Sequence, residues 1–284
     1  MSQFHILHII PDPRLHILNG YNDVIKTIVW GLRCHGHEVT YAVNQPRLDA
    51  RNIVFGANMA PDILIGMLPA DSIIYNLEQV SGLRAIPAMA DRLRLLAQRF
   101  VLWDYDQGNL LGWKQIDPAV RTAYVPIGYA PALSTIPKAD VQDIDILIYG
   151  GPSERRLKVF SDLCLSGASA LFCFGLYDSA RDELIARSKL VLNISHAGSH
   201  VFSIVRASYL LANRKAVIAD ARPDMAIERD ICSALAVADI EHFTYACHHY
   251  LDDTAAREEL EERGFEIFSK RDIRQIVAMA LQVS

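Results

Sequence analysis

The strongest constraint on the fold is a strand–helix–strand pattern at the start of the chain. Residues 4–10 form a short, isoleucine-rich run that ends at a Pro-Asp-Pro loop, which predicts a buried strand. Residues 24–32 repeat apolar side chains at three- and four-residue spacing, which predicts an amphipathic helix. Gly36 can adopt the left-handed conformation that ends a helix, and residues 38–43 resume strand character. A helix that connects two strands of one sheet forces them to be parallel.

The same alternation continues to the end of the chain. In the first half, apolar runs separated by loops or short helices predict strands at residues 52–55, 63–67, 72–75, 100–103 and 122–125. In the second half, the patterns predict strands at 144–149, 170–174, 190–194 and 216–219, and helices at 154–165, 179–188, 202–213, 254–263 and 271–283. This alternation indicates an α/β fold with two tandem Rossmann-like domains and a cleft between them.

The length of 284 residues suits two domains of ordinary size. Residues 131–145 are rich in proline, aspartate and small residues, and a strongly apolar run follows them, so a boundary is expected near Pro137. The first domain is therefore predicted to span residues 1–137 and the second residues 138–270. A C-terminal helix at about residues 271–284 can pack back on the first domain.

The composition argues against several classes of function. With 28 Lys and Arg against 33 Asp and Glu, the net charge of −5 is unlike that of a protein that binds nucleic-acid phosphates. No run approaches the roughly 20 apolar residues that cross a bilayer, and no basic segment leads into an apolar signal sequence. We therefore expect a cytoplasmic protein without a transmembrane segment, for which peripheral membrane association is still possible. Five cysteines without a C-x-x-C pair give no sign of a zinc or redox site.

Two parts of the sequence resemble GT-B-type glycosyltransferases. Residues 19–43, NGYNDVIKTIVWGLRCHGHEVTYAV, are similar to the first turn and helix of that group, which end in Gly-His-x-Val. The second half resembles bacterial family-one-like and family-four-like glycosyltransferases in DIDILIYGGPSERR, LFCFGLYDSARDELIARSKLVLN and SIVRASYLLANRKAVIAD. The resemblance implies a hexosyl or related transferase that moves a sugar from a nucleoside diphosphate donor to a glycan, lipid-linked or small-molecule hydroxyl. It implies no cofactor beyond this nucleotide-sugar substrate.

The first donor-binding candidates follow a predicted strand and open a helix. Arg155 and Arg156 come shortly after Gly150 and Gly151, at the edge of a parallel sheet where ligands bind. Two guanidinium groups at a helix start can pair bidentately with a diphosphate. The alternative is a solvated first helical turn, and the resemblance favours phosphate contact.

A second junction, at residues 193–200, is polar and leads into an apolar helix. In GT-B enzymes the corresponding loop holds the donor phosphates and sugar, through backbone N–H groups that face the developing charge. The resemblance therefore implies donor contacts from His196, Gly198, Ser199 and His200. For the two histidines, a surface or capping role is the alternative.

Two further side chains are candidates for the donor site. Arg206 lies on the helix after this junction, where it faces the cleft or packs against Asp220. Tyr177 follows a predicted strand and can stack on a nucleobase, and a purely structural tyrosine is the alternative. Ser203 departs from the pattern, because related sequences tend to have glutamate there, and this leaves the donor sugar open.

Candidate catalytic residues lie in the first half. Glu78 and Asp104 each come after an apolar strand, and an inverting transferase needs a base that deprotonates the acceptor hydroxyl. The alternative for each is a capping or loop carboxylate, and in a retaining enzyme they would orient the acceptor. Asn19, Gly20 and Tyr21 lie at a helix N-terminus and are predicted to line the cleft.

The sequence also contains a pattern that is found in metal-dependent glycosyltransferases. Asp104 with Asp106, and Asp143 with Asp145, match the D-x-D pattern that holds a metal in GT-A enzymes. Two tandem sheets favour the metal-independent type instead, so no metal is expected. An epimerase or hydrolase that acts on the nucleotide-sugar is a second hypothesis. A non-catalytic nucleotide-sugar-binding protein is a third, and Ser203 favours it.

Overall fold

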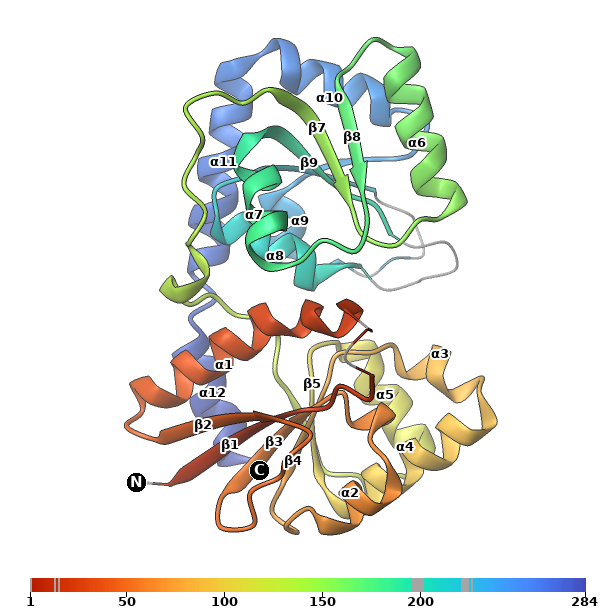
Figure 1. The fold of residues 1–284 in the computed structure, drawn as a ribbon, viewed down its shortest axis with the longest axis vertical. Coiled ribbons are helices and arrows are strands. Elements are labelled where there is room, and N and C mark those ends of the chain that lie inside the picture. The colour runs from red at the N-terminus through yellow and green to blue at the C-terminus, as the bar shows by residue number, and fades with distance from the viewer. Residues whose placement is uncertain (1, 13, 15, 196–201, 221–224, 226) are drawn as a thin grey trace. The chain divides into compact units, whose positions relative to one another are not determined.

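The computed structural model describes residues 2–12, 14, 16–195, 202–220, 225 and 227–284. The chain divides into two compact units, Met1–Gly128 together with Asp272–Ser284, and Tyr129–Arg271. Each unit is built around one sheet with helices on its faces (Figure 1). This is the α/β architecture of two Rossmann-like domains that the alternation of strands and helices predicts.

The first sheet has six parallel strands in the order β2-β1-β3-β4-β5-β6. They are β1 (Gln3–His8), β2 (Glu38–Val43), β3 (Arg51–Phe55), β4 (Ile73–Asn76), β5 (Val101–Asp104) and β6 (Thr122–Tyr124). Strand β1 pairs with both β2 and β3, so the strand order reverses direction beside it. Because all six strands are parallel, their carboxyl ends share one edge of the sheet.

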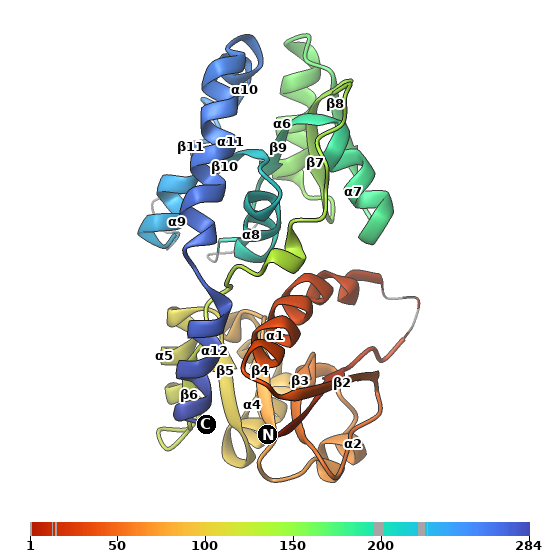
Figure 2. The same ribbon diagram turned by 90° about the vertical axis from the view of Figure 1, so that its left-hand side faces the viewer.

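Two groups of helices cover the faces of this sheet. Leu7, Val54 and Leu102 of the strands belong to one core with side chains of α2 (Asp62–Met67), α4 (Pro87–Arg99) and α5 (Gln107–Ile116). On the other side, α12 (Ile273–Gln282) packs against α1 (Asn22–Cys34) (Figure 2). The remaining helices of this unit are η1 (His16–Tyr21), η2 (Ala57–Met59) and α3 (Val80–Arg84).

The turn after α1 has the left-handed glycine expected from the sequence. Gly36 has a φ of +78°, and its N–H donates to the carbonyl of Arg33. The N–H of His37 donates to the carbonyl of Leu32, so two carbonyls at the end of α1 are satisfied before β2 begins. The prediction of a helix end at Gly36 is confirmed.

The predicted strand at residues 63–67 is wrong, because this segment belongs to helix α2. Ile63 and Met67 are 76% and 52% exposed, whereas Leu64 and Ile65 between them are buried. Two adjacent buried positions fit one face of a helix and do not fit the strict alternation of a strand. Pro61, immediately before the helix, provides a conformation compatible with a helix start.

The second sheet has five parallel strands in the order β11-β10-β9-β7-β8. They are β7 (Ile144–Tyr149), β8 (Ala170–Cys173), β9 (Ser188–Asn193), β10 (Ala216–Asp220) and β11 (Ala236–Ala238). Around them lie η3 (Pro131–Leu133), α6 (Glu154–Leu165), α7 (Asp178–Arg187), α8 (Ile204–Ala212), α9 (Arg229–Ala234), α10 (Phe243–Asp252) and α11 (Thr254–Ser269). Strand β7 lies between β8 and β9, so the order reverses here as it does beside β1.

The segment after Gly128 belongs to the second unit because specific contacts hold it there. The ring of Tyr129 packs edge-on against Phe265 and Phe268 of α11. The side-chain oxygen of Asn213 accepts from two backbone N–H groups of the segment, each at 2.9 Å, and its Nδ2 donates to the carbonyl of Leu133. From the sequence the boundary is expected near Pro137, and the structure divides the chain between Gly128 and Tyr129.

A close helix contact in the second unit leads to a stability prediction. A Cβ on Gly264 would lie 2.8 Å from Cδ2 of Leu211 and 2.9 Å from the carbonyl oxygen of Ala234. We expect Gly264→Ala to lower the free energy of unfolding by about 1–3 kcal/mol in urea denaturation, because the backbone carbonyl cannot move away cheaply. Gly66→Ala is the control, since a Cβ there meets no atom within 4 Å. Equal stability of Gly264→Ala and the parent protein would contradict this packing.

Candidate functional site

Both sheets bring their strand ends to an edge where ligands bind in open α/β folds. In such sheets the site lies outside the carboxyl ends of the strands, at the point where the strand order reverses. In the second unit this point is between β7 and β9. In the first unit it is between β1 and β3. The side chains at these two edges are therefore the first candidates for function.

In the second unit, Gly150 opens the space at the end of β7. Its φ is +118°, a conformation that favours glycine. A Cβ at this position would lie 2.7 Å from Nη2 of Arg206 and 3.2 Å from Nη1 of Arg156. The glycine therefore lets two guanidinium groups approach the backbone at the edge of the sheet.

Arg156 ties the ends of β7 and β9 together. Its Nε and Nη2 donate to the carbonyl of Ile194 at 2.9 and 2.7 Å, and its Nη1 donates to the carbonyl of Gly151. Only 4% of Arg156 is exposed. Burial, together with the nearby charge of Arg206, lowers its pKa to about 10. Most of its N–H groups serve the backbone, so its first role is to shape the edge and add positive charge there.

Arg155 is held by a buried carboxylate. Its Nε donates to Asp220 at 2.9 Å, and Asp220 is fully buried at the end of β10. The other oxygen of Asp220 accepts from the backbone N–H and the hydroxyl of Ser195, at 2.9 and 3.1 Å. Asp220 therefore fixes both Arg155 and the residue that follows β9. Its importance was not apparent from the sequence beyond its place after a strand.

Arg206, on the first turns of α8, is the third arginine at this edge. Its Nη1 donates to Oδ1 of Asn193 at 3.2 Å, and its guanidinium lies 5.1 Å from the ring centroid of Tyr149. Its Nε is buried and has no hydrogen-bond partner among the residues that the structure describes. Burial lowers its pKa. Here the guanidinium faces Asn193 and Tyr149, and the sequence left this orientation open.

Tyr177 lies close to this cluster. It is half-buried at the start of α7, and burial raises its pKa while the positive charges of Arg206 and Arg181 lower it. Phe174, which directly follows β8, is 69% exposed and was not identified from the sequence. Its position immediately after a strand was the available signal. The loop candidates His196, Gly198, Ser199 and His200 lie outside the described residues.

In the first unit, Asp104 is the centre of a buried hydrogen-bond network at the end of β5. One carboxylate oxygen accepts from Nδ2 of Asn109 and from the N–H of Asp106, both at 3.0 Å. The other accepts from Nδ2 of Asn76 at 2.8 Å and Nε1 of Trp113 at 2.7 Å. Asp104 is 0% exposed. All four of these donors point at a carboxylate that has no contact with solvent.

Glu78 lies just beyond β4 and contacts a predicted cleft residue. One oxygen of its carboxylate accepts a short hydrogen bond from the hydroxyl of Tyr21, at the start of α1. Burial and the Glu78 carboxylate both raise the pKa of Tyr21. Asn19 and Gly20 precede Tyr21 in η1 and are half-buried. The structure thus brings together Glu78 and Tyr21, which the sequence indicated separately.

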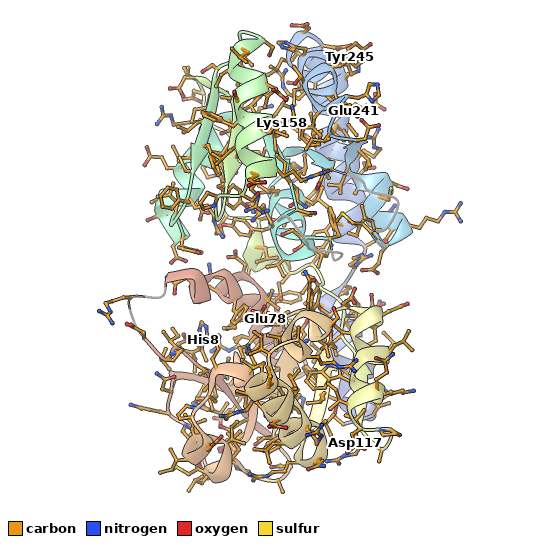
Figure 3. The ribbon with its side chains drawn as sticks, turned by 90° about the vertical axis from the view of Figure 1, so that its right-hand side faces the viewer. His8, Glu78, Asp117, Lys158, Glu241 and Tyr245 are labelled. Atoms are coloured by element: carbon orange, nitrogen blue, oxygen red, sulfur yellow. The ribbon has the colours of Figure 1, made fainter. Side chains whose placement is uncertain are left out.

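His8 lies next to the Tyr21–Glu78 pair, on the side of β2. His8, at the end of β1, has its ring centroid 5.8 Å from that of Tyr21, and its Nδ1 lies 3.2 Å from the hydroxyl of Tyr41. Figure 3 labels His8 and Glu78 among the side chains of this unit. The side chains of Tyr41, His8, Tyr21 and Glu78 therefore form a row that joins β2, β1, η1 and the segment after β4.

The D-x-D aspartates all have other partners. Asp106 caps α5 by accepting from the N–H of Asn109 at 2.9 Å. Asp143 pairs with Arg187 and Asp145 with Lys189. Among the described residues, no group of three or more His, Cys, Asp and Glu side chains is arranged to hold a metal ion. Within the same residues, no helix is long and apolar enough to cross a membrane.

Solved structures of other proteins share this two-domain architecture. No family model matches the sequence, and no curated protein matches it. Among solved structures, HepE of Anabaena in complex with UDP and glucose has a TM-score of 0.66 at 13% identity, over 99% of this chain and 100% of that one. WaaG, a glycosyltransferase involved in lipopolysaccharide biosynthesis, has a TM-score of 0.61 at 11% identity, over the whole of both chains.

A third similar structure is AviGT4, a glycosyltransferase involved in avilamycin A biosynthesis. Its TM-score is 0.60 at 11% identity, over 99% of this chain and 96% of that one. The fold is GT-B. The GT-B assignment covers both units, because each of these likenesses extends over nearly the full length of the chain.

The buried network of the first GT-B domain predicts a pH-dependent stability. Burial raises the pKa of Asp104 from 3.8 to about 6, against the hydrogen bonds that lower it. The folded protein then binds more protons than the unfolded chain between these values, so this contribution is full below pH 3.8 and is lost as the pH rises through about 6. We expect the unfolding free energy of the parent minus that of Asp104→Asn to fall by about 3 kcal/mol across this window.

Urea denaturation at a series of pH values measures this difference. Asp117→Asn is the control, because an asparagine oxygen can still accept from the N–H of Ala119 as Asp117 does. A difference for Asp104→Asn that changes no more over this window than the difference for Asp117→Asn would show that the Asp104 pKa is not raised.

Proposed function

We propose that this GT-B protein is a glycosyltransferase that moves a sugar from a nucleoside diphosphate sugar to an acceptor hydroxyl. The observation that carries the proposal is the group of three arginines at the strand-order reversal of the second sheet. Arg155 forms an ion pair there with the buried carboxylate of Asp220. Arg156 and Arg206 donate to backbone and amide oxygens and, among the described residues, pair with no carboxylate, so this edge keeps an excess of positive charge. A diphosphate fits this excess.

The donor is proposed to be a UDP-hexose. HepE has been solved with UDP-glucose and with UDP, and both GT-B domains of the present chain align with it. The Nε of Arg206, which has no partner among the described residues, would donate to a phosphate oxygen. Gly150 lets the guanidinium groups of Arg206 and Arg156 lie close to the backbone at this edge. Phe174 and Tyr177 offer ring faces for the base at the end of β8 and the start of α7.

Charge on the leaving diphosphate would be offset by these arginines, without a metal. In a site removed from water, fixed cations directed at the developing charge stabilise it without further reorganisation. This role applies to Arg206 more than to Arg156, because the N–H groups of Arg156 are occupied by two backbone carbonyls. The His196 to His200 loop is proposed to add backbone donors.

Glu78 is the proposed base for the acceptor hydroxyl. Its carboxylate is half-buried and accepts from Tyr21, whereas Asp104 is fully buried and accepts four hydrogen bonds. A base needs a lone pair within reach of the proton that it removes. Asp104 is therefore reassigned from a base to a residue that organises the loop before α3. If the reaction retains configuration, Glu78 orients the acceptor.

Loss of Arg206 tests the donor site. We expect Arg206→Ala to weaken UDP binding about 10- to 100-fold, because charge-assisted hydrogen bonds to a phosphate are worth about 1.5–3 kcal/mol. Isothermal titration calorimetry with UDP, GDP and ADP measures the affinity and identifies the preferred nucleotide. Lys158→Ala removes an exposed positive charge from α6 and should leave the affinity unchanged. Unaltered nucleotide affinity in Arg206→Ala would rule out this phosphate site.

Loss of the Glu78 carboxylate tests the base. We expect Glu78→Gln to lower kcat about 10²- to 10⁴-fold while the Kd for UDP stays within twofold, because the donor site lies in the other unit. Sugar transfer is measured with UDP-glucose and a panel of saccharide acceptors. Incubation with the donor alone separates transfer from epimerisation or hydrolysis of the nucleotide-sugar. Full turnover by Glu78→Gln would remove it from the mechanism.

A further inference from the structure

Hydrogen bonds from two asparagine side chains hold the backbone of the short segment that carries Glu78. Residues 77–79 connect β4 to α3, and the carbonyl of Glu78 accepts from Nδ2 of Asn76 at 2.7 Å and Nδ2 of Asn109 at 2.8 Å. The N–H of Glu78 donates back to Oδ1 of Asn76 at 3.3 Å. Both backbone groups of Glu78 are therefore held by side chains.

Asn109 reaches this segment from another element. It lies in the first turn of α5, is 5% exposed, and accepts from the N–H of Val80 at 3.0 Å. Its Nδ2 donates both to the Glu78 carbonyl and to Asp104. One amide group thus joins the end of β5, the carbonyl of Glu78 and the start of α3.

Asp104 sets the orientation of this amide. Its carboxylate can only accept when ionised, so the NH₂ groups of Asn76 and Asn109 must face it. Flipping either amide would place an oxygen against the carboxylate and leave a buried N–H group without its acceptor, which costs about 1–3 kcal/mol. With the NH₂ group of Asn109 fixed, its second hydrogen is directed at the Glu78 carbonyl, and its oxygen is directed at Val80.

The side chain of Glu78 is held from the opposite direction. Tyr21 donates to the carboxylate from the start of α1, whereas Asn109 holds the carbonyl from α5. Contacts from Tyr21, before α1, and from Asn109, in α5, thus together define where the Glu78 carboxylate lies. A displacement of about 1 Å at a reacting group can cost about 10²-fold in rate, so such a double hold matters for a base.

We infer that Asn109 is a positioning residue for Glu78, with Asp104 and Trp113 as its buried anchor. Asn109 itself takes no part in bond making: it keeps the Glu78 backbone in the one placement from which the carboxylate contacts Tyr21 and can reach an acceptor hydroxyl. This inference rests on the proposed role of Glu78 as the base.

Asn109→Ala tests the inference in the full chain. We expect kcat to fall about 10- to 100-fold, with the KM for the donor within twofold, because the donor-binding residues are in the other unit. We also expect faster hydrogen exchange of the backbone amides at residues 78–80, since Val80 loses its acceptor. If Asn109→Ala does not fold, Asn109→Ser, which keeps one hydroxyl in the same space, has the same expected result.

Asn52 provides a matched control in the same unit. It is fully buried, its Oδ1 accepts from the N–H of Arg47 at 3.0 Å, and its Nδ2 donates to the carbonyls of Arg47 and Ala50 at 2.7 and 2.9 Å. Asn52→Ala therefore removes the same kinds of hydrogen bond from a loop at the opposite edge of the sheet. It should lose a similar free energy of unfolding and keep the parent kcat.

The outcomes separate this inference from the proposed function. If Glu78→Gln is inactive and Asn109→Ala keeps full turnover, the positioning role is wrong and the base assignment stands. If Asn109→Ala and Asn52→Ala lose turnover equally, the effect is general destabilisation and the positioning role is also wrong. If the parent protein transfers no sugar, the proposed function fails. Hydrogen exchange then still tests whether Asn109 holds the Glu78 segment: unchanged exchange of the amides at residues 78–80 in Asn109→Ala would show that it does not.

Discussion

Parallel pairing of the strands is the constraint on which both candidate edges depend. Because every strand in a sheet runs in one direction, side chains that are far apart in the sequence follow strand ends at one edge. Asn76 and Asp104 are register partners at the ends of β4 and β5, and this pairing puts an amide beside a carboxylate. Gly151 and Ile194 come just after β7 and β9 in the same way, which lets Arg156 bridge their carbonyls. The chemistry of each edge is thus a consequence of strand direction.

The two edges differ in charge. Glu78 and Asp104 lie at strand ends of the first sheet. Arg155, Arg156 and Arg206 lie at the edge of the second, where Arg155 pairs with Asp220. An anionic leaving group is stabilised by the cations, and a hydroxyl that must lose a proton is served by a carboxylate. This separation supports the proposed division of work, in which the second unit would hold the donor and the first would receive the acceptor.

Much of the fold could be predicted from local patterns, and most of the network could not. The bounds of α6 and the left-handed Gly36 follow from apolar spacing and glycine placement. Glu78 and Asp104 were identifiable from their place after apolar strands. Two features of the network depend on contacts between separate strand connections. The Asp104 carboxylate accepts four hydrogen bonds, and the Asn109 amide donates to the Glu78 carbonyl. No short sequence motif indicates such contacts. The sequence alone therefore does not distinguish a buried carboxylate such as Asp104 from a more accessible one such as Glu78.

The arginine cluster shows why buried charge in this fold points to a ligand. Arg206 is partly desolvated, its Nε lacks a partner among the described residues, and its charge adds to that of Arg156. Burying a charge is unfavourable unless it is paired. Among the described residues, the Asp220 carboxylate pairs with Arg155, and no carboxylate forms an ion pair with Arg156 or Arg206. Gly150 permits this arrangement, because it has no side chain that would collide with the guanidinium groups of Arg206 and Arg156. If the proposed diphosphate completes this arrangement, its binding stabilises the folded state, so diphosphate binding and the stability of the second unit are expected to be coupled.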